Sequence, residues 1–135
     1  MVPCIVLDTE TTGFPNNRGG FRARIIEVGA VVITEDCRVV SPISFFVRQP
    51  EAHLRSWQAK RAMKVHGIPV EVVLREGLDA KEAAPRFARW VERVKAAFGV
   101  TEVRAYNQGF DFWFLERTPW DFFERTGLKK GEDIQ

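Results

Sequence analysis

The sequence contains little cysteine, histidine or tyrosine, and it has no long apolar run. Its 135 residues include two cysteines, two histidines and one tyrosine. Cys4 and Cys37 lie far apart and outside any metal-ligand spacing, which excludes a disulfide scaffold and a zinc cluster. We expect both thiols to be buried and reduced, as in a cytoplasmic protein. Residues 1–10 lack the basic region of a signal peptide, and their apolar run is too short to span a membrane.

No repeat, low-complexity tract or linker divides the chain, so we expect one domain over residues 1–135. Hydrophobic residues make up 45% of the sequence and charged residues 28%, which is ordinary for a globular domain with its own core. The formal net charge of +2 permits a nucleic-acid partner without requiring one.

Residues 4–13, CIVLDTETTG, change abruptly from apolar to polar. The apolar half reads as a strand buried on both faces, and Asp8 and Glu10 follow at its end. Side chains alternate between the two faces of a strand, so these carboxylates point the same way. Close like charges favour a bound cation, and oxygen ligands favour Mg²⁺ or Mn²⁺ over zinc. A plain polar turn, with Asp8 capping a bend, is the simpler alternative that the spacing disfavours.

The next part of the chain predicts an antiparallel meander. A loop at residues 14–21 is rich in Pro, Asn and Gly, and Arg18, Arg22 and Arg24 lie on it or beside it. Strands are expected over residues 24–33 and 43–47, because both segments are β-branched and apolar and are joined by a short turn.

Two helical segments follow the meander. Residues 53–68 are basic and helix-like up to a break at Gly67, and they hold both histidines. For His53 the expected role is at the surface or in capping. Residues 81–98 place large apolar side chains at helical spacing and predict a core helix, with its regular part starting close to Glu82 because of Pro85.

A short fourth strand is expected over residues 103–106. It is reached through a helical crossover, which suits parallel pairing beside the first strand. Its polar end runs from Tyr106 to Asp111 and leads into another helix. Ligands in open α/β sheets collect beyond the carboxyl ends of the central strands, so Asp111 is expected to meet Asp8 and Glu10 in one cleft.

Three motifs together resemble the DEDD superfamily of 3′-to-5′ exonucleases. They are D-x-E at the end of the first strand, HGI at residues 66–68 and N-x-x-x-D at residues 107–111. The resemblance implies an α/β, ribonuclease H-like fold with a mixed sheet in the order 3-2-1-4 and a fifth strand beyond. It also implies that Asp8, Glu10 and Asp111 hold two divalent ions, Mg²⁺ or Mn²⁺, for the attack of water on a phosphodiester.

The resemblance further implies a binding site for the 3′ end of single-stranded DNA or RNA. The residues at matching positions are Thr11, Thr12, Gly13, Phe14, His66 and Asn107. Phe14 stands where the family places an apolar wedge against the terminal bases, and for His66 a structural role is favoured over a catalytic one. A DNA polymerase or another replication protein is the further partner that the resemblance suggests.

The chain departs from the family pattern after Asp111. A fourth carboxylate, preceded by a His or Tyr as general base, is expected on a last helix, but the remaining residues contain neither His nor Tyr. We therefore expect the fifth strand and the last helix to be missing and the domain to be incomplete at its C-terminal end. The fourth strand would then be an unpaired edge, with Trp113, Trp120 and Phe123 near an exposed flank through which a homodimer could form.

Three functions are compatible with these observations. The first is a metal-dependent 3′-to-5′ exonuclease, with little or no activity in this shortened chain. The second is a non-catalytic nucleic-acid-binding or polymerase-associated module that keeps the fold. The third and weakest is a haloacid-dehalogenase-like phosphatase, whose D-x-D-x-T motif would require Asp where this chain has Glu10.

Overall fold

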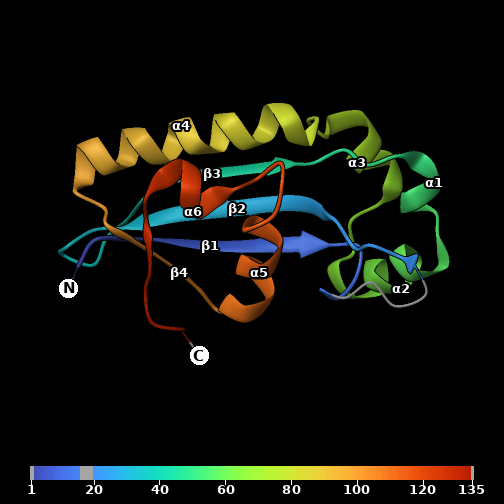
Figure 1. Cartoon of the computed structure of the whole chain (residues 1–135), viewed down its shortest axis with the longest axis horizontal. Helices are drawn as coiled ribbons and strands as arrows, with labels where there is room; N and C mark the ends of the chain where they lie inside the picture. Colours follow the sequence, from blue (N-terminus) through green and yellow to red (C-terminus); the bar gives the residue numbers. More distant parts are fainter. Residues whose placement is uncertain (1, 16–19, 135) are drawn as a thin grey trace.

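The computed structural model describes residues 2–15 and 20–134, and the described part contains five strands and six helices (Figure 1). The strands are β1 (Cys4–Thr11), β2 (Ile25–Ile33), β3 (Val39–Phe46), β4 (Glu102–Ala105) and β5 (Lys129–Lys130). The helices are α1 (Glu51–Leu54), α2 (Trp57–His66), α3 (Val70–Glu76), α4 (Ala80–Phe98), α5 (Gln108–Leu115) and α6 (Phe122–Thr126).

The strands form one mixed sheet in the order β3-β2-β1-β4-β5. β1 pairs antiparallel with β2 and parallel with β4, and β2 pairs antiparallel with β3. The predicted order 3-2-1-4 is confirmed, with β1 in the interior of the sheet. β4 pairs only with Cys4–Leu7, so the carboxyl end of β1 extends past β4 and pairs with β2 alone.

The expectation that a fifth strand is missing is wrong. Lys129 and Lys130 pair in parallel with Glu102 and Val103, and the N–H of Gly131 donates to the carbonyl of Val103 at 2.8 Å. Sequence patterns did not reveal β5, because two lysines carry no apolar alternation and only ladder hydrogen bonds define the strand. Between β5 and residue 134 the structure shows no helix.

The predicted exposed flank is also largely covered. Trp120 is buried at 6% exposure and packs in the main core, with Trp113 and Phe123 partly buried against that core. The paired edge of β4 and these packed rings remove the reason for expecting a large apolar flank there.

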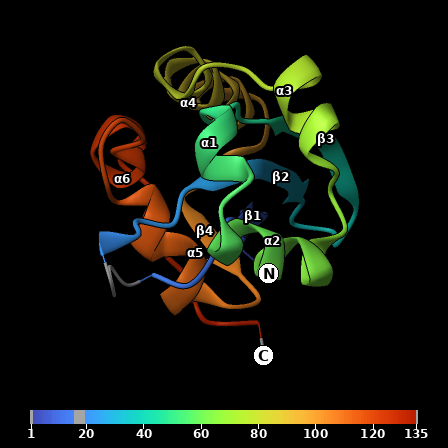
Figure 2. The ribbon, with the colours of Figure 1, turned by 90° about the vertical axis from the view of Figure 1, so that its right-hand side faces the viewer.

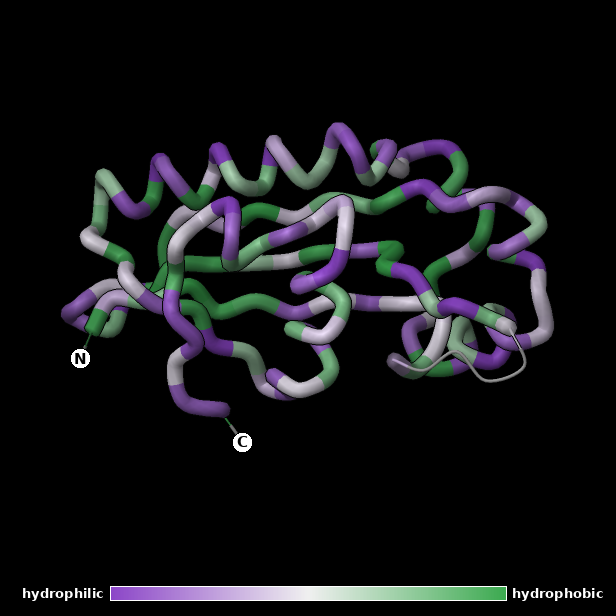
Figure 3. The backbone as a smooth tube through the Cα atoms, viewed as in Figure 1, coloured by the Kyte–Doolittle hydropathy of each residue, from purple (hydrophilic) through white to green (hydrophobic). Residues whose placement is uncertain are grey.

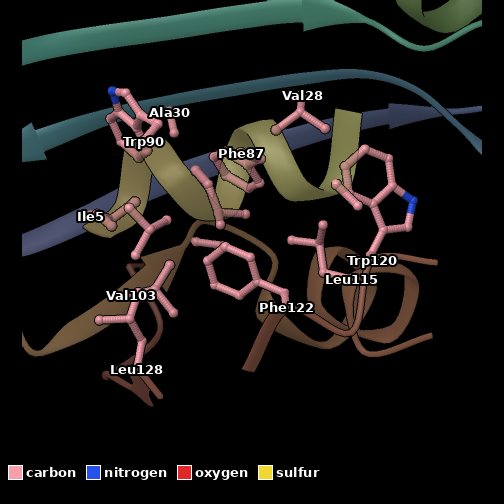
Figure 4. Close-up of a cluster of buried hydrophobic side chains, with 14 of the residues drawn as sticks. Ile5, Val28, Ala30, Phe87, Trp90, Val103, Leu115, Trp120, Phe122 and Leu128 are labelled. Atoms are coloured by element: carbon pink, nitrogen blue, oxygen red, sulfur yellow. The ribbon is translucent and has the colours of Figure 1, made fainter. Parts of the chain in front are cut away.

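The main core lies between the sheet and helix α4. Figure 2 shows α4 and α6 together on one side of the sheet, and these two helices contact each other. Phe87 of α4 is fully buried and packs against Phe122 of α6, with ring centroids 5.2 Å apart (Figure 4). Burial of a ring of this size contributes about 1.5–3 kcal/mol, so a few such side chains fix α4 on the sheet.

Helix α4 begins at Ala80, earlier than Pro85 suggested. The side chain of Asp79 accepts the N–H of Lys81 at 2.8 Å as an N-cap, and Gly99 ends the helix with φ of +70°. The hydropathy colouring of Figure 3 shows α4 alternating between apolar and polar residues, while the interior strands are mostly apolar. This pattern orients the helix on the sheet.

The basic segment forms two helices rather than one. Ser56 separates α1 from α2, because its hydroxyl accepts the N–H of Ala59 at 3.3 Å and donates to the carbonyl of His53 at 2.7 Å. Leu54 packs with Ile26 and Val73 in a second, smaller core. The short helices α1, α2 and α3 thus gather near the end of the sheet where β1 ends (Figure 1).

The two cysteines differ in their exposure to solvent. Cys4 is buried as expected, whereas Cys37 lies exposed in the turn between β2 and β3, and neither forms a disulfide. Among the described residues, none of the helices combines the length and apolarity needed to cross a membrane.

Candidate functional site

The end of β1 presents two carboxylates on one face of the sheet. Asp8 is exposed and Glu10 is partly buried, while Thr9 and Thr11 between and beyond them are buried on the other face. Regular pairing with β2 shifts between Glu10 and Thr11, which marks the end of the strand. The predicted alternation of Asp8 and Glu10 is therefore present.

Asp111 joins this strand end from helix α5. It lies in the first turn of α5 and is 1% exposed. One of its carboxylate oxygens, Oδ1, accepts the Thr9 N–H at 3.1 Å and the Thr9 hydroxyl at 2.6 Å. Its other oxygen, Oδ2, is buried and has no hydrogen-bond partner among the described residues. The side chain thus reaches the end of β1 at Thr9, the residue between Asp8 and Glu10.

A further carboxylate, which is not the one expected on a last helix, is Glu27 of β2. It stands directly opposite Glu10 in the β1–β2 pair. In the sequence it is visible only as a charged interruption of an apolar strand. The antiparallel register is the signal that could have found it, because directly opposed residues share one face of a sheet. Two like charges opposite each other weaken the pairing unless something neutralises them.

Burial, and for three of these carboxylates the charge of a neighbour, raises their pKa values. Burial raises the pKa of Asp111 from 3.8 to about 6, against the hydrogen bonds from Thr9 and together with the charge of Asp8. The pKa of Glu10 is raised by burial and then by the charges of Asp8, Glu27 and Asp111. Burial, followed by the charge of Asp8, also raises the pKa of Glu27. The end of β1 is thus a site of unfavourable negative charge that a cation would relieve.

The donor chemistry at this end of the sheet fits a hard divalent cation, because the groups are carboxylates and Asp111 Oδ2 is a buried acceptor without a donor. The geometry is looser than the sequence suggested. In the ranges 2–15 and 20–134, no group of three or more His, Cys, Asp or Glu side chains is gathered closely enough to hold a metal ion. Asp8, Glu10 and Asp111 share one strand end without forming a single ligand sphere.

A cleft of about 670 Å³ opens beside Glu10. Its walls come from the end of β1 and the following loop, from α2 and from the start of α5; they comprise Glu10, Thr11, Gly13, Phe14, Phe21, Trp57, Gln58, Arg61, Ala62, Val65, His66 and Phe110. Three apolar side chains in it are open to solvent: Phe14 at 75%, Trp57 at 67% and Val65 at 89% exposure. The lining is mostly apolar and aromatic.

Most of the predicted substrate residues line this cleft, but two do not. Thr11, Gly13, Phe14 and His66 are among its walls, whereas Thr12 is buried beneath them at 2% exposure. Asn107 is exposed at the start of α5, and its side chain makes no capping hydrogen bond.

The hydroxyls of Thr11 and Thr12 are already engaged. The Thr11 hydroxyl donates to the carbonyl of Gly13 at 2.6 Å. The Thr12 hydroxyl accepts the backbone N–H of Arg24 at 2.9 Å and bonds to His53 Nε2 at 2.8 Å. These two side chains therefore shape the loop after β1, and His53 has a role there that sequence reasoning did not give it.

His66 lines the cleft, and a hydrogen bond within its own turn decides which ring nitrogen carries the proton. Its Nδ1 accepts the N–H of Ile68 at 3.0 Å, so the proton of the neutral ring is on Nε2. Burial lowers the pKa of His66, which keeps the ring neutral. The structural role of His66 stays a prediction from the sequence.

The arginines beside the strand end are placed unequally. Arg18 lies outside the described residues, while Arg22 and Arg24 are exposed. A further cation, Arg61, sits over the Trp57 ring at 4.8 Å and lines the cleft. Positive charge thus borders the cleft on its α2 wall.

A family model described as Exonuclease (RNase_T) matches residues 5–130. No curated protein matches the sequence. Solved structures of exonuclease I share the fold. The E. coli enzyme in complex with a dT13 oligonucleotide is 18% identical over 96% of this chain and 25% of its own, with a TM-score of 0.58. A product-bound exonuclease I is 18% identical over 96% of this chain and 27% of its own, with a TM-score of 0.66. This chain therefore spans about a quarter of these proteins.

Proposed function

The chain belongs to the RNase_T exonuclease family, and on that premise we propose that it acts at the 3′ end of single-stranded nucleic acid with the carboxylates at the end of β1. The observation that carries the proposal is the reach of buried Asp111 to Thr9, which brings its unpartnered Oδ2 beside a strand end already charged by Asp8 and Glu10. Nuclease function itself follows from the family.

In this proposal Asp8, Glu10 and Asp111 would hold two divalent ions, Mg²⁺ or Mn²⁺. When bound, such ions activate water as a nucleophile and stabilise charge on the phosphodiester oxygens. Thr9 holds Asp111 by two hydrogen bonds, leaving one oxygen for a ligand. Glu27 adds to the negative charge that favours cation binding at the strand end.

The cleft supports a single-stranded substrate. Exposed Phe14 and Trp57 offer rings on which unpaired bases can stack, which is tolerant of base identity and contributes about 1–3 kcal/mol per base. Arg61 places a positive charge where the backbone would pass, and the Nε2–H of His66 can donate to an acceptor on the nucleotide. The exonuclease I complex with dT13 supports DNA as the first substrate to test.

We further propose that hydrolysis by this chain is slow. A general base contributes about 10²–10⁴-fold to such reactions. Of the two histidines, His66 is fixed as a donor, and His53 is bonded to Thr12. The second candidate function, a non-catalytic binding module, is favoured by the looseness of the carboxylate group in the described residues. A polymerase or replication protein as partner, and a homodimer, stay predictions from the sequence.

The test is a single-stranded DNA labelled at its 5′ end, incubated with Mn²⁺ and resolved on a gel over time. We expect slow, stepwise shortening from the 3′ end that Asp8→Asn abolishes. The control is Glu76→Gln, which removes an exposed carboxylate of α3 and should leave the rate unchanged. Tight binding without any shortening would favour the binding module, and shortening that survives Asp8→Asn would overturn the proposed site.

A further inference from the structure

His53 contacts two parts of the loop that follows β1. Its Nε2 bonds to the hydroxyl of Thr12 at 2.8 Å. Its ring stacks on Phe21 with centroids 4.9 Å apart and planes only 7° from parallel. Thr12 follows the strand end directly, and Phe21 lines the cleft. The His53 side chain therefore contacts both Thr12, which lies beneath the cleft, and Phe21, which forms part of its wall.

The backbone that carries His53 is itself held in place. Its carbonyl accepts the hydroxyl of Ser56, which caps α2, and its neighbour Leu54 is 4% exposed. Leu54 packs against Ile26 of β2 in the second core. The imidazole thus extends from a fixed point toward the loop.

The hydrogen-bond directions around Thr12 agree with such an anchor. The Thr12 hydroxyl accepts the Arg24 N–H, and the Thr12 N–H donates to the Arg24 carbonyl, both at 2.9 Å. The hydroxyl hydrogen is then available for His53 Nε2, which accepts in the neutral tautomer that carries its proton on Nδ1. Burial and then the charge of Arg24 lower the pKa of His53, so the ring is neutral near pH 7.

We propose that His53 is a positioning residue that holds Thr12 and Phe21 in the arrangement that binding of a single-stranded nucleic acid requires. This inference rests on the proposed function. A wall fixed before binding avoids the entropic cost of ordering it on contact, so the contribution of His53 should be visible as affinity. The Thr12 hydrogen bond and the Phe21 stack are two separable parts of that contribution.

The experiment measures the dissociation constant of a fluorescent single-stranded oligonucleotide for the whole chain. His53→Phe keeps a ring for Phe21 and removes the acceptor, whereas His53→Gln keeps an acceptor and removes the ring. Thr12→Val removes the hydroxyl and keeps the shape. Each of His53→Phe and Thr12→Val should weaken binding by roughly 2- to 10-fold, the range for one hydrogen bond. The matched control is Glu51→Gln, an exposed residue of the same helix, which should bind as wild type does.

The double variant His53→Phe/Thr12→Val decides between positioning and a general loss of stability. If the two side chains act through their shared bond, the double variant binds no more weakly than Thr12→Val alone, which also loses the acceptor for the Arg24 N–H, and His53→Gln recovers part of the affinity. Wild-type affinity in both single variants, or fully additive losses, would overturn the inference. Failure of wild type to bind any oligonucleotide would overturn the proposed function and this inference with it. Unfolding free energies of all variants identify any that fail to fold, and Thr12→Val then carries the test.

Discussion

Replacing Asp111 by asparagine should stabilise the metal-free protein at neutral pH. The folded protein holds this carboxyl with a pKa of about 6 instead of 3.8, chiefly because it is buried. At about 1.4 kcal/mol for each pH unit, ionisation of Asp111 costs the folded state about 3 kcal/mol well above pH 6. Asparagine removes this cost, and its carbonyl oxygen can still accept both hydrogen bonds from Thr9.

The sign follows from proton binding. Because the folded state holds the Asp111 proton more tightly, stability is highest below pH 3.8 and is lost as the pH rises through about 6. About 1 kcal/mol of this stability is already lost at pH 4.5. The free energy of unfolding of Asp111→Asn, relative to that of wild type, should therefore rise by about 2 kcal/mol between pH 4.5 and pH 7.5. Using the change with pH cancels any constant effect of the substitution.

The assay is urea unfolding of both proteins at the two pH values, with a chelator present. Asp36→Asn is the control, because the Thr34 hydroxyl, and then Arg38, lower the pKa of that exposed carboxyl. Its loss should therefore change stability with pH in the opposite direction and only slightly. A pH-independent difference between Asp111→Asn and wild type would refute the reasoning, as would a difference that favours wild type at pH 7.5.

Two other predictions concern the cleft and the charged strand end. Trp57→Ala should weaken binding of a single-stranded oligonucleotide by roughly 5- to 150-fold, equivalent to about 1–3 kcal/mol for one stacked base, as measured by fluorescence anisotropy. Unchanged affinity would show that bases do not stack there. Glu27→Gln should lower the pKa of Glu10, because the charge of Glu27 helps to raise it, and an NMR titration of the Glu10 carboxyl would detect the change. An unaltered titration curve would mean that the opposed pair is screened by solvent.

The sheet was predictable where side-chain patterns carry it. The apolar strands and the helical crossover predicted the meander and the parallel pairing of β4 with β1, and the resemblance to the exonuclease superfamily supplied the full order 3-2-1-4. β5 was not predictable, because Lys129 and Lys130 form a strand only through backbone hydrogen bonds to β4. The covered flank was not predictable either, because the burial of Trp120 depends on how the segment between α5 and β5 folds against the sheet.

The candidate site was predictable at positions where strand geometry fixes the side chain. Alternation in β1 placed Asp8 and Glu10 on one face, and the neighbouring parallel strand brought Asp111 to the same end. Glu27 and His53 depend on register and on a contact across 41 positions, which a single sequence does not reveal. The cleft walls supplied by Trp57 and Arg61 likewise follow from the packing of α2.

The central claim is that the carboxylates at the end of β1 bind a divalent cation. A Mn²⁺ titration followed by electron paramagnetic resonance tests this claim directly, because Mn²⁺ that is bound to the protein no longer contributes to the signal of the free ion. We predict that wild type and Glu76→Gln remove Mn²⁺ from solution equally and that Asp8→Asn and Glu10→Gln bind it far more weakly. Equal binding by all four proteins, or binding by none, would contradict the account.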